Sequence, residues 1–209
     1  VSGCSSGEEV YSLAIALVEF LAEQKLHFPV QLFGTYINLK SLDRARAGFY
    51  PVGIAADVSP ERLRRFFVKS DSGYRINKTI REMCVFARQN VTVDPPFSNL
   101  DLISCRNVLI YFGALLQRKV FPVFHYALRT EGYLLLGASE TVGSFVDLFT
   151  LVDKKAKFYA KKATITRAAV TFGHVLPEQT IEAPSSIETR PPVQAAATTQ
   201  INTRGAREF

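Results

Sequence analysis

Polar residues follow an apolar, strand-like segment near the middle of the chain. Residues 100–105 have the sequence Leu-Asp-Leu-Ile-Ser-Cys, Arg106 and Asn107 come next, and an aliphatic run then leads to Tyr111. Ligands of open α/β sheets bind beyond the carboxyl ends of the strands, so polar side chains at this position suit a binding site. The alternative is an ordinary strand end, with Arg106 in solvent and Tyr111 in the core. The spacing alone leaves both interpretations open.

A second candidate site is a glycine-containing loop at the start of the sequence. Gly3 and Gly7 bracket residues 4–6, and Glu8 and Glu9 follow at the start of a helix-like segment. Glycines allow a ligand to approach the backbone closely, and the free N–H groups of a helix start usually favour an anion. Two carboxylates repel an anion and favour a cationic ligand. A capped helix without a ligand explains the same loop.

Helical and strand-like patterns alternate around these two segments. Apolar spacing predicts a helix from Glu8 to about Gln24, with Ser5 or Ser6 as its cap. Asn38 and Ser59 are the expected N-caps of two later helices. Strands are predicted at 30–37, 74–76, 85–87, 100–105 and 132–137, helices at 39–47, 60–67, 78–83 and 114–128, and a closing hairpin at 149–159. This alternation predicts an α/β fold with a mostly parallel sheet and an antiparallel C-terminal hairpin.

Composition separates residues 1–162 from residues 163–209. The chain is 47% hydrophobic, which suffices for a sizeable core, but no apolar run is long enough to span a membrane. No secretory signal is visible. From residue 163 onward Ala, Thr, Pro, Glu and Gln dominate without a period, which predicts a disordered tail or linker. The three cysteines are widely spaced and no metal-ligand spacing occurs, so we expect a cytoplasmic protein without disulfides or metal.

The net charge of +6 lies in the first 162 residues, because the arginines and glutamates beyond them cancel. A basic surface suits an acidic partner, either nucleic acid or a carboxylate-rich protein. The chain lacks the aromatic and glycine pattern of single-strand RNA binders. A solvated lysine face is the more common explanation, and nucleic-acid binding is not expected.

The two candidate sites belong to a set of five collinear motifs. These are residues 2–12 (Ser-Gly-Cys-Ser-Ser-Gly-Glu-Glu-Val-Tyr-Ser), 45–51 (Ala-Arg-Ala-Gly-Phe-Tyr-Pro), 86–91 (Phe-Ala-Arg-Gln-Asn-Val), 101–112 and 132–140. Together they resemble the CheR-type chemotaxis receptor protein-glutamate O-methyltransferases over residues 1–162. Residues 54–81 are most similar to the form fused to methylesterase and sensor domains. The resemblance implies a class I, Rossmann-like fold that uses S-adenosylmethionine.

The resemblance also implies which residues form the site. Its cofactor contacts fall on Glu9, Tyr36, Asn90, Val91, Cys105, Arg106 and Asn107. Tyr111 and Arg106 correspond to the catalytic positions, with Tyr111 near the methyl group and the acceptor carboxylate. Its implied role is orientation and polarisation, because a carboxylate is already ionised at neutral pH and needs no general base. The acceptor would be a glutamate of a receptor or other signalling protein.

Tyr36 departs from the family pattern. Relatives carry an acid after the second strand, and nucleotide-binding folds generally use such a carboxylate to hold both ribose hydroxyls. A phenol offers one hydrogen bond and is bulkier, so weaker cofactor binding is expected. Asn38 is the alternative ribose contact, although it is also the expected N-cap.

A second departure concerns the start of the sequence. Val1 and Ser2 correspond to the end of the family's first central strand, and the family's N-terminal helical domain has no counterpart. Strands 30–37 and 100–105 should therefore border a vacant strand position. An exposed strand edge of this kind predicts self-association.

Three functions follow from these observations. The first is S-adenosylmethionine-dependent methylation of receptor glutamates. The second is a non-catalytic, degenerate domain that serves as an interaction module, which Tyr36 and the missing strand favour. The third is a nucleic-acid methyltransferase, because residues 94–97 (Asp-Pro-Pro-Phe) are similar to a motif of amino-methylating enzymes. Those residues precede the strand at 100–105 instead of following it, which disfavours the third.

Overall fold

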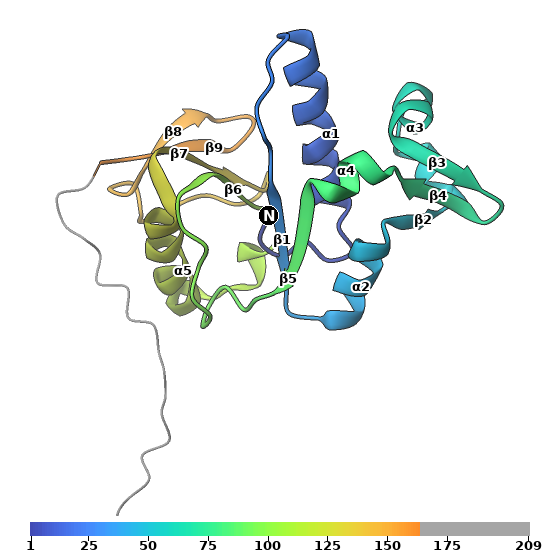
Figure 1. Cartoon of the computed structure of the whole chain (residues 1–209). Helices are drawn as coiled ribbons and strands as arrows, with labels where there is room; N and C mark the ends of the chain where they lie inside the picture. Colours follow the sequence, from blue (N-terminus) through green and yellow to red (C-terminus); the bar gives the residue numbers. More distant parts are fainter. Residues whose placement is uncertain (164–209) are drawn as a thin grey trace, which may run out of the picture. The chain divides into compact units, whose positions relative to one another are not determined.

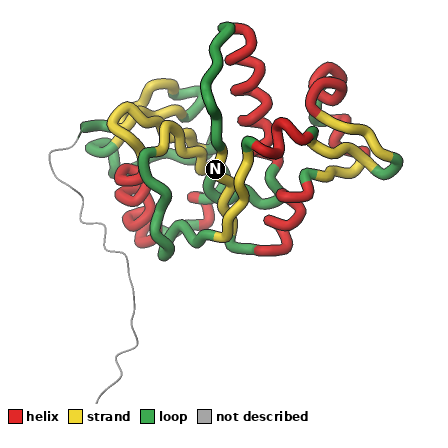
Figure 2. Tube along the Cα trace, in the orientation of Figure 1, coloured by secondary structure: helices red, strands yellow, loops and turns green. Residues whose placement is uncertain are grey.

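The computed structural model describes residues 1–163, and every structural statement below concerns this part of the chain. The tail predicted for 163–209 lies outside the described residues except for residue 163. Figures 1 and 2 show helices and strands that alternate along the chain and three separate sheets. The predicted α/β class is therefore confirmed.

Parallel pairing dominates around the candidate site. Strand β1 (Leu32–Tyr36) pairs in parallel with β5 (Cys84–Arg88), and β6 (Leu100–Cys105) pairs in parallel with β7 (Leu128–Leu136). The closing hairpin adds β9 (Phe158–Lys161) and β8 (Phe149–Asp153) in antiparallel fashion, in the order β6-β7-β9-β8. The mostly parallel arrangement with an antiparallel C-terminal hairpin is as predicted.

Val1 and Ser2 lie between β1 and β6 and hydrogen-bond to both strands. The amino group of Val1 donates to the carbonyl oxygen of Phe33 at 2.7 Å, and the N–H of Thr35 donates to the carbonyl of Val1 at 2.9 Å. On the other side, the N–H of Ser2 donates to the carbonyl of Ser104 at 2.8 Å. These two residues join two sheets that are otherwise separate, at the position where a strand between β1 and β6 is expected.

A mostly apolar cavity of about 520 Å³ continues this strand position away from Ser2. Its wall includes Leu13 and Leu17 of helix α1 (Glu8–Glu23), Phe33 of β1, Leu102 of β6, and Phe124 of helix α5 (Ala114–Ala127). The cavity therefore runs alongside the strands and reaches their carboxyl ends, where Thr35, Ser104 and Val91 line it. Its mostly apolar lining suits an extended apolar segment better than a polar small molecule.

Two of the predicted helix caps are confirmed and one is wrong. Asn38 caps helix α2 (Leu39–Ala47) by accepting from the N–H of Ser41 at 3.2 Å, and Ser59 caps helix α3 (Pro60–Phe66). Helix α1 instead begins at Gly7, whose φ of 92° is left-handed and whose backbone lies against Ala45. A serine cap would require an extended backbone at that position, so neither Ser5 nor Ser6 caps the helix.

A small antiparallel sheet was not fully predicted. It consists of β2 (Phe49–Pro51), β4 (Gly73–Ile76) and β3 (Phe67–Ser70) in the order β2-β4-β3, with the 3₁₀ helix η1 (Val52–Ala56) and α3 beside it. Sequence alternation predicted only the strand at 74–76. Strands of three or four residues, mostly half-buried or exposed, are too short to carry a clear period.

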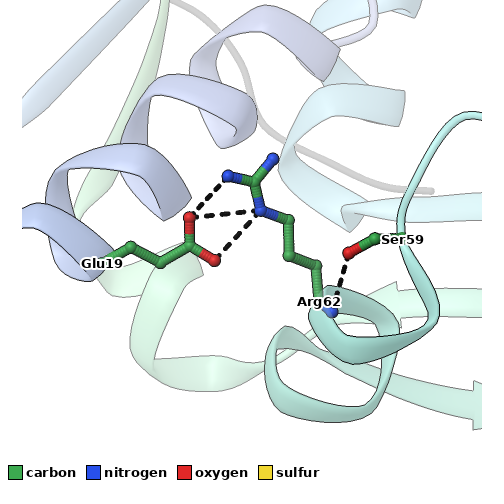
Figure 3. Close-up of polar contacts among 3 residues, drawn as sticks. All are labelled: Glu19, Ser59 and Arg62. Carbon is green, nitrogen blue, oxygen red and sulfur yellow. Dashed lines mark hydrogen bonds and ion pairs between the residues drawn. The ribbon is translucent and has the colours of Figure 1, made fainter.

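An ion pair connects helix α3 to helix α1 (Figure 3). The guanidinium of Arg62 reaches both carboxylate oxygens of Glu19, with Nη2 2.6 Å from Oε2 and Nε 3.0 Å from Oε1. This contact lowers the pKa of Glu19. The Arg62 side chain is 49% exposed, so the pair contributes about 1 kcal/mol or less and mainly fixes the orientation of the helix.

Two hydrophobic clusters form the core. The first contains Val10 and Tyr11 of α1, Leu42 of α2, and Ile80 of helix α4 (Lys78–Glu82). The second is built around Phe121 and Phe124 of α5, Leu134 of β7, and Phe149 of β8. Within residues 1–163, no helix has both the length and the apolar content that crossing a membrane would require.

Gly3 brings the first loop against the segment that follows β6. A Cβ atom at position 3 would lie 2.3 Å from Cγ2 of Val108, and the φ of Gly3 is +77°. Both the contact and the backbone angle require glycine. The two loops that the sequence singled out are therefore in direct contact.

We expect Gly3→Ala to lower the free energy of unfolding by about 1–3 kcal/mol, because it combines an overpacked contact with a strained backbone. Gly53→Ala is the matched control, since a Cβ at that position meets no atom within 4 Å. Urea unfolding of both variants measures the difference. Equal stability of the two variants would show that the loops do not pack as described.

Candidate functional site

The carboxyl ends of β1 and β6 lie on either side of the loop that begins at Gly3. Thr35, the fourth residue of β1, accepts hydrogen bonds from the N–H groups of Gly3 and Cys4 at 2.9 and 3.0 Å. Ser104, the fifth residue of β6, binds Ser2. The residues that come directly after Thr35 and Ser104 include Tyr36 and Cys105, so the structure brings several predicted cofactor positions to one edge of the sheets.

The two acids at the start of α1 have different environments. Glu9 is half-buried, and its Oε1 accepts a short hydrogen bond from the hydroxyl of Ser104, which is 1% exposed. Glu8 is exposed, and its carboxylate accepts from the hydroxyl of Ser6 at 2.8 Å. Glu9 is therefore the acid held against the end of β6. This placement suits the cofactor contact expected for it, and Glu8 has no such position.

Tyr36 is half-buried and packs against the first hydrophobic cluster. Its carbonyl accepts from the N–H of Gln89 at 3.1 Å, and it pairs with Arg88 across β1 and β5. The acceptor oxygen of Asn38 is meanwhile occupied by the N–H of Ser41. The helix cap therefore competes with any ribose contact by Asn38, and Tyr36 is held in part by packing.

Asn90 and Val91 follow the carboxyl end of β5. The side-chain oxygen of Asn90 accepts from the N–H and the hydroxyl of Thr92 at 3.0 and 2.7 Å. Its backbone N–H donates to Asp94 at 2.7 Å. These bonds leave the Nδ2 amide of Asn90 as the donor that could serve an adenine ring nitrogen. Val91 lines the cavity and packs against the second cluster.

The residues at 94–97 have structural roles in this loop. Asp94 closes the turn at Asn90, and the carbonyl of Pro95 accepts from the side chain of Gln89 at 2.8 Å. The ring of Phe97 stacks on Phe33 with 4.7 Å between centroids. These contacts account for the sequence without a base-binding role, so they give no support to a nucleic-acid methyltransferase.

The segment after β6 turns sharply and exposes its functional side chains. Asn107 has a φ of +57°, and a 3₁₀ helix, η2 (Leu109–Tyr111), follows. Arg106 is exposed, and Tyr111 is 79% exposed. The alternative in which Tyr111 lies in the core is therefore wrong. Both side chains are accessible to a partner, whereas Cys105 is fully buried at the end of the strand.

The cysteine thiols are not prepared for nucleophilic chemistry. Burial raises the pKa of Cys105 to about 12, and the nearby Glu140 carboxylate adds to this effect. Burial likewise raises the pKa of Cys4 to about 11 and that of Cys84 to about 12. All three thiols are therefore protonated near neutral pH. Any contact of Cys105 with a cofactor involves its backbone and not a thiolate.

Two residues of the site had no role assigned from the sequence. Ser104 holds Glu9, and Glu140 accepts hydrogen bonds from five backbone N–H groups, four of them in residues 107–110. Both lie within the collinear motifs, but the periodicity of a helix or a strand does not reveal the role of either residue. Among residues 1–163, no group of three or more His, Cys, Asp or Glu side chains is arranged to hold a metal ion.

The donor set fits S-adenosylmethionine in part. Glu9 offers a carboxylate for the cationic amino group, Asn90 offers an amide donor, and residues 105–107 offer backbone groups at the end of β6. The end of β1 fits less well, because Tyr36, at the position where the resemblance implies a carboxylate, is a phenol that packs against the core.

Comparison with solved structures gives low overall similarity. A TehB-like SAM-dependent methyltransferase from Corynebacterium glutamicum matches 77% of this chain and 75% of its own, with 14% identity and a TM-score of 0.40. A SAM-dependent methyltransferase from Methanosarcina mazei matches 65% of this chain and 49% of its own, with 16% identity and a TM-score of 0.38.

Comparison with protein sequences is more specific. A chemotaxis protein methyltransferase 1 of Pseudomonas aeruginosa is 35% identical over 157 residues, and the chemotaxis protein methyltransferase of Borreliella burgdorferi is 34% identical over 145 residues. These alignments cover 73% and 68% of this chain but 57% and 51% of the relatives. A third relative, an uncharacterized 104.1 kDa protein of Rhodobacter capsulatus, is 37% identical over 158 residues, which are 17% of its length. The chain thus spans only part of each relative.

The family assignment rests on a match that covers most of the described chain. The family model described as CheR methyltransferase, SAM binding domain, matches residues 1–158. This range includes all the predicted site residues and ends within β9. The domain that this model describes binds S-adenosylmethionine, which is the cofactor of the family. The chain belongs to the CheR methyltransferase family.

Proposed function

We propose that this chain is the cofactor-binding and catalytic part of an enzyme that methylates glutamate side chains of chemotaxis or other signalling receptors. The observation that carries the proposal is the placement of Glu9, Asn90 and residues 105–107 at the carboxyl ends of β1, β5 and β6, with Arg106 and Tyr111 exposed beside them. Family membership supports the methyl-transfer chemistry.

The side chains divide the work of methyl transfer. S-adenosylmethionine, when bound, supplies a methyl group on a positively charged sulfur. Glu9 would hold its amino group, and the Nδ2 of Asn90 would donate to the adenine. Tyr111 and Arg106 hold and orient the acceptor carboxylate, which is ionised at neutral pH and attacks without a general base. The rate would then depend mainly on proximity and alignment. As the ester bond forms, the methyl–sulfur bond would break, so the products would be a neutral methyl ester and S-adenosylhomocysteine.

A non-catalytic interaction module is the second candidate, and Tyr36 is the observation that favours it. The packed phenol of Tyr36 would bind the ribose of the cofactor more weakly than a carboxylate does. The domain would then keep its fold but lose cofactor binding and catalysis. Isothermal titration with S-adenosylmethionine and S-adenosylhomocysteine separates the two functions. Saturable binding at one site supports the enzyme, and absence of binding supports the module.

The cytoplasm is the compartment we propose for this function. Cys4, Cys84 and Cys105 are free thiols, and Cys4 and Cys105 are buried. Unpaired thiols are typical of a reducing compartment. The acceptor would then be the cytoplasmic part of a receptor or another protein with accessible glutamates.

We expect Tyr36→Asp to strengthen binding of S-adenosylhomocysteine by roughly ten- to hundredfold. A carboxylate that holds two ribose hydroxyls replaces one phenol bond, a difference of about 1–3 kcal/mol. Isothermal titration of the parent and the variant measures this change. Tyr36→Phe is the control, because it keeps the ring and removes the hydroxyl, and it should bind no better than the parent. If Tyr36→Asp binds no better either, Tyr36 is held by packing and the ribose contact lies elsewhere.

We also propose that the chain self-associates through the unfilled strand position between β1 and β6. Val1 and Ser2 already bond to the carbonyls of Phe33 and Ser104, and the apolar cavity continues from there between the same two strands. An extended segment from a second copy would satisfy both edges. We expect the sedimentation coefficient to rise with protein concentration.

Leu102→Lys tests this self-association, because Leu102 lines the cavity on the β6 side. A charge at this position should weaken the association, and Leu115→Lys should not, since Leu115 is 70% exposed and outside the cavity. A monodisperse monomer of the parent at high concentration would contradict the proposal.

A further inference from the structure

Glu140 is a buried carboxylate that lies just beyond strand β7. Only 4% of the surface of Glu140 is exposed to solvent. Within residues 1–163 it takes part in no ion pair. A buried charge without a counter-ion is costly unless hydrogen bonds compensate it, so its partners must carry the compensation.

Five backbone N–H groups provide that compensation. Oε1 of Glu140 accepts from Leu109 at 2.8 Å, from Val108 at 2.9 Å and from Ile110 at 3.3 Å. Oε2 accepts from Gly137 at 2.7 Å and from Asn107 at 3.1 Å. Hydrogen bonds to an ionised acceptor are stronger than neutral ones. Four of the five donors form the continuous segment 107–110.

The segment that Glu140 holds connects the two residues placed at the reacting groups. Arg106 comes directly before it, and Tyr111 comes directly after it. Both side chains are exposed, and neither is fixed by burial of its own. Their positions therefore depend on the backbone between them. That backbone includes the left-handed Asn107 and the 3₁₀ turn. The Glu140 carboxylate binds its N–H groups, Gln117 donates to the carbonyl of Leu109 at 3.2 Å, and the Leu109 side chain is buried.

The carboxylate of Glu140 is closely packed against the backbone of Gly137 and Asn107. A Cβ atom on Gly137 would lie 2.7 Å from Oε2 of Glu140 and 3.0 Å from the backbone nitrogen of Asn107. Val108, one of the anchored residues, also packs against Gly3 in the loop that leads to Glu9. The carboxylate thus fixes the ends of β6 and β7 relative to each other and, through Val108, the first loop.

We propose that Glu140 is a positioning residue for methyl transfer. It touches neither cofactor nor acceptor, and it holds residues 107–110 so that Arg106 and Asn107 meet the cofactor and Tyr111 meets the acceptor glutamate. This inference rests on the proposed function for the identity of the ligands. The anchoring of the segment itself does not depend on that function.

Glu140→Gln tests the inference by replacing one carboxylate oxygen with an NH₂ group, which cannot accept from the backbone donors. Amide hydrogen exchange should speed up at least about tenfold at residues 107–110 and remain unchanged in α1 and α5, which corresponds to about 1.4 kcal/mol locally. Affinity for S-adenosylhomocysteine should fall at least about tenfold. Glu131→Gln is the matched control, because Glu131 is an exposed residue of β7, the strand that leads to Glu140, and should change neither measurement.

Gly137→Ala gives a second variant that displaces the carboxylate without removing it, and it should produce the same local pattern. Unchanged exchange at residues 107–110 in both variants would overturn the proposal. Equal acceleration throughout the core, or unfolding of both variants, would also overturn it, because Glu140 would then serve general stability. If the parent chain binds no S-adenosylhomocysteine, the proposed function fails, and the exchange measurement still decides whether Glu140 fixes the segment.

Discussion

The site depends on the backbone hydrogen bonds that hold β1 and β6 on either side of Val1 and Ser2. Three such bonds, to Phe33, Thr35 and Ser104, join sheets that otherwise have no shared ladder in residues 1–163. This junction and the hydrogen bond between Glu9 and Ser104 set the separation of the two strand ends. Because the bonds run through the backbone, they determine where the next residues of each strand emerge. They do not constrain which side chains those residues carry.

Buried acids and exposed side chains have different tasks around this junction. Glu9 and Glu140 are fixed by hydrogen bonds from Ser104 and from the backbone of residues 107–110. Arg106 and Tyr111 are exposed and available to a partner. A carboxylate acceptor requires alignment more than acid or base catalysis, so rigid anchoring of an exposed segment is a suitable design for such a site. Tyr36 is the position where packing and ligand binding compete.

Sequence patterns predicted the regular elements well and the tertiary contacts poorly. The strand at 100–105 and the helix at 39–47 are confirmed with their bounds, because a buried apolar run and a capped amphipathic helix both have strong local signals. The predicted serine cap of α1 is wrong, because Gly7 caps the helix in a left-handed conformation. The close contact of Gly7 with Ala45, which is distant in sequence, favours this conformation. The small sheet at 49–76 was largely missed because its strands are short.

The same limit applies to the site. Motif resemblance predicts roles for Glu9, Arg106 and Tyr111, and these roles stay predictions. The Glu140 anchor joins residues about thirty positions apart, and no local period encodes it. The exposure of Tyr111 could not be decided from spacing, because an aliphatic run with a tyrosine suits both a core strand and a surface turn. Contacts between loops follow from the pairing of the strands, which the sequence specifies only indirectly.

The central claim is that the carboxyl ends of β1, β5 and β6 form the cofactor site. The most direct measurement is a titration of this chain with S-adenosylhomocysteine followed by the NMR resonances of its backbone amides. The account predicts saturable shifts at residues 3–9, 36–38, 89–91 and 105–111, with one dissociation constant. Shifts confined to the cavity-lining residues Leu13, Leu17 and Leu102, or no shifts at all, would contradict it.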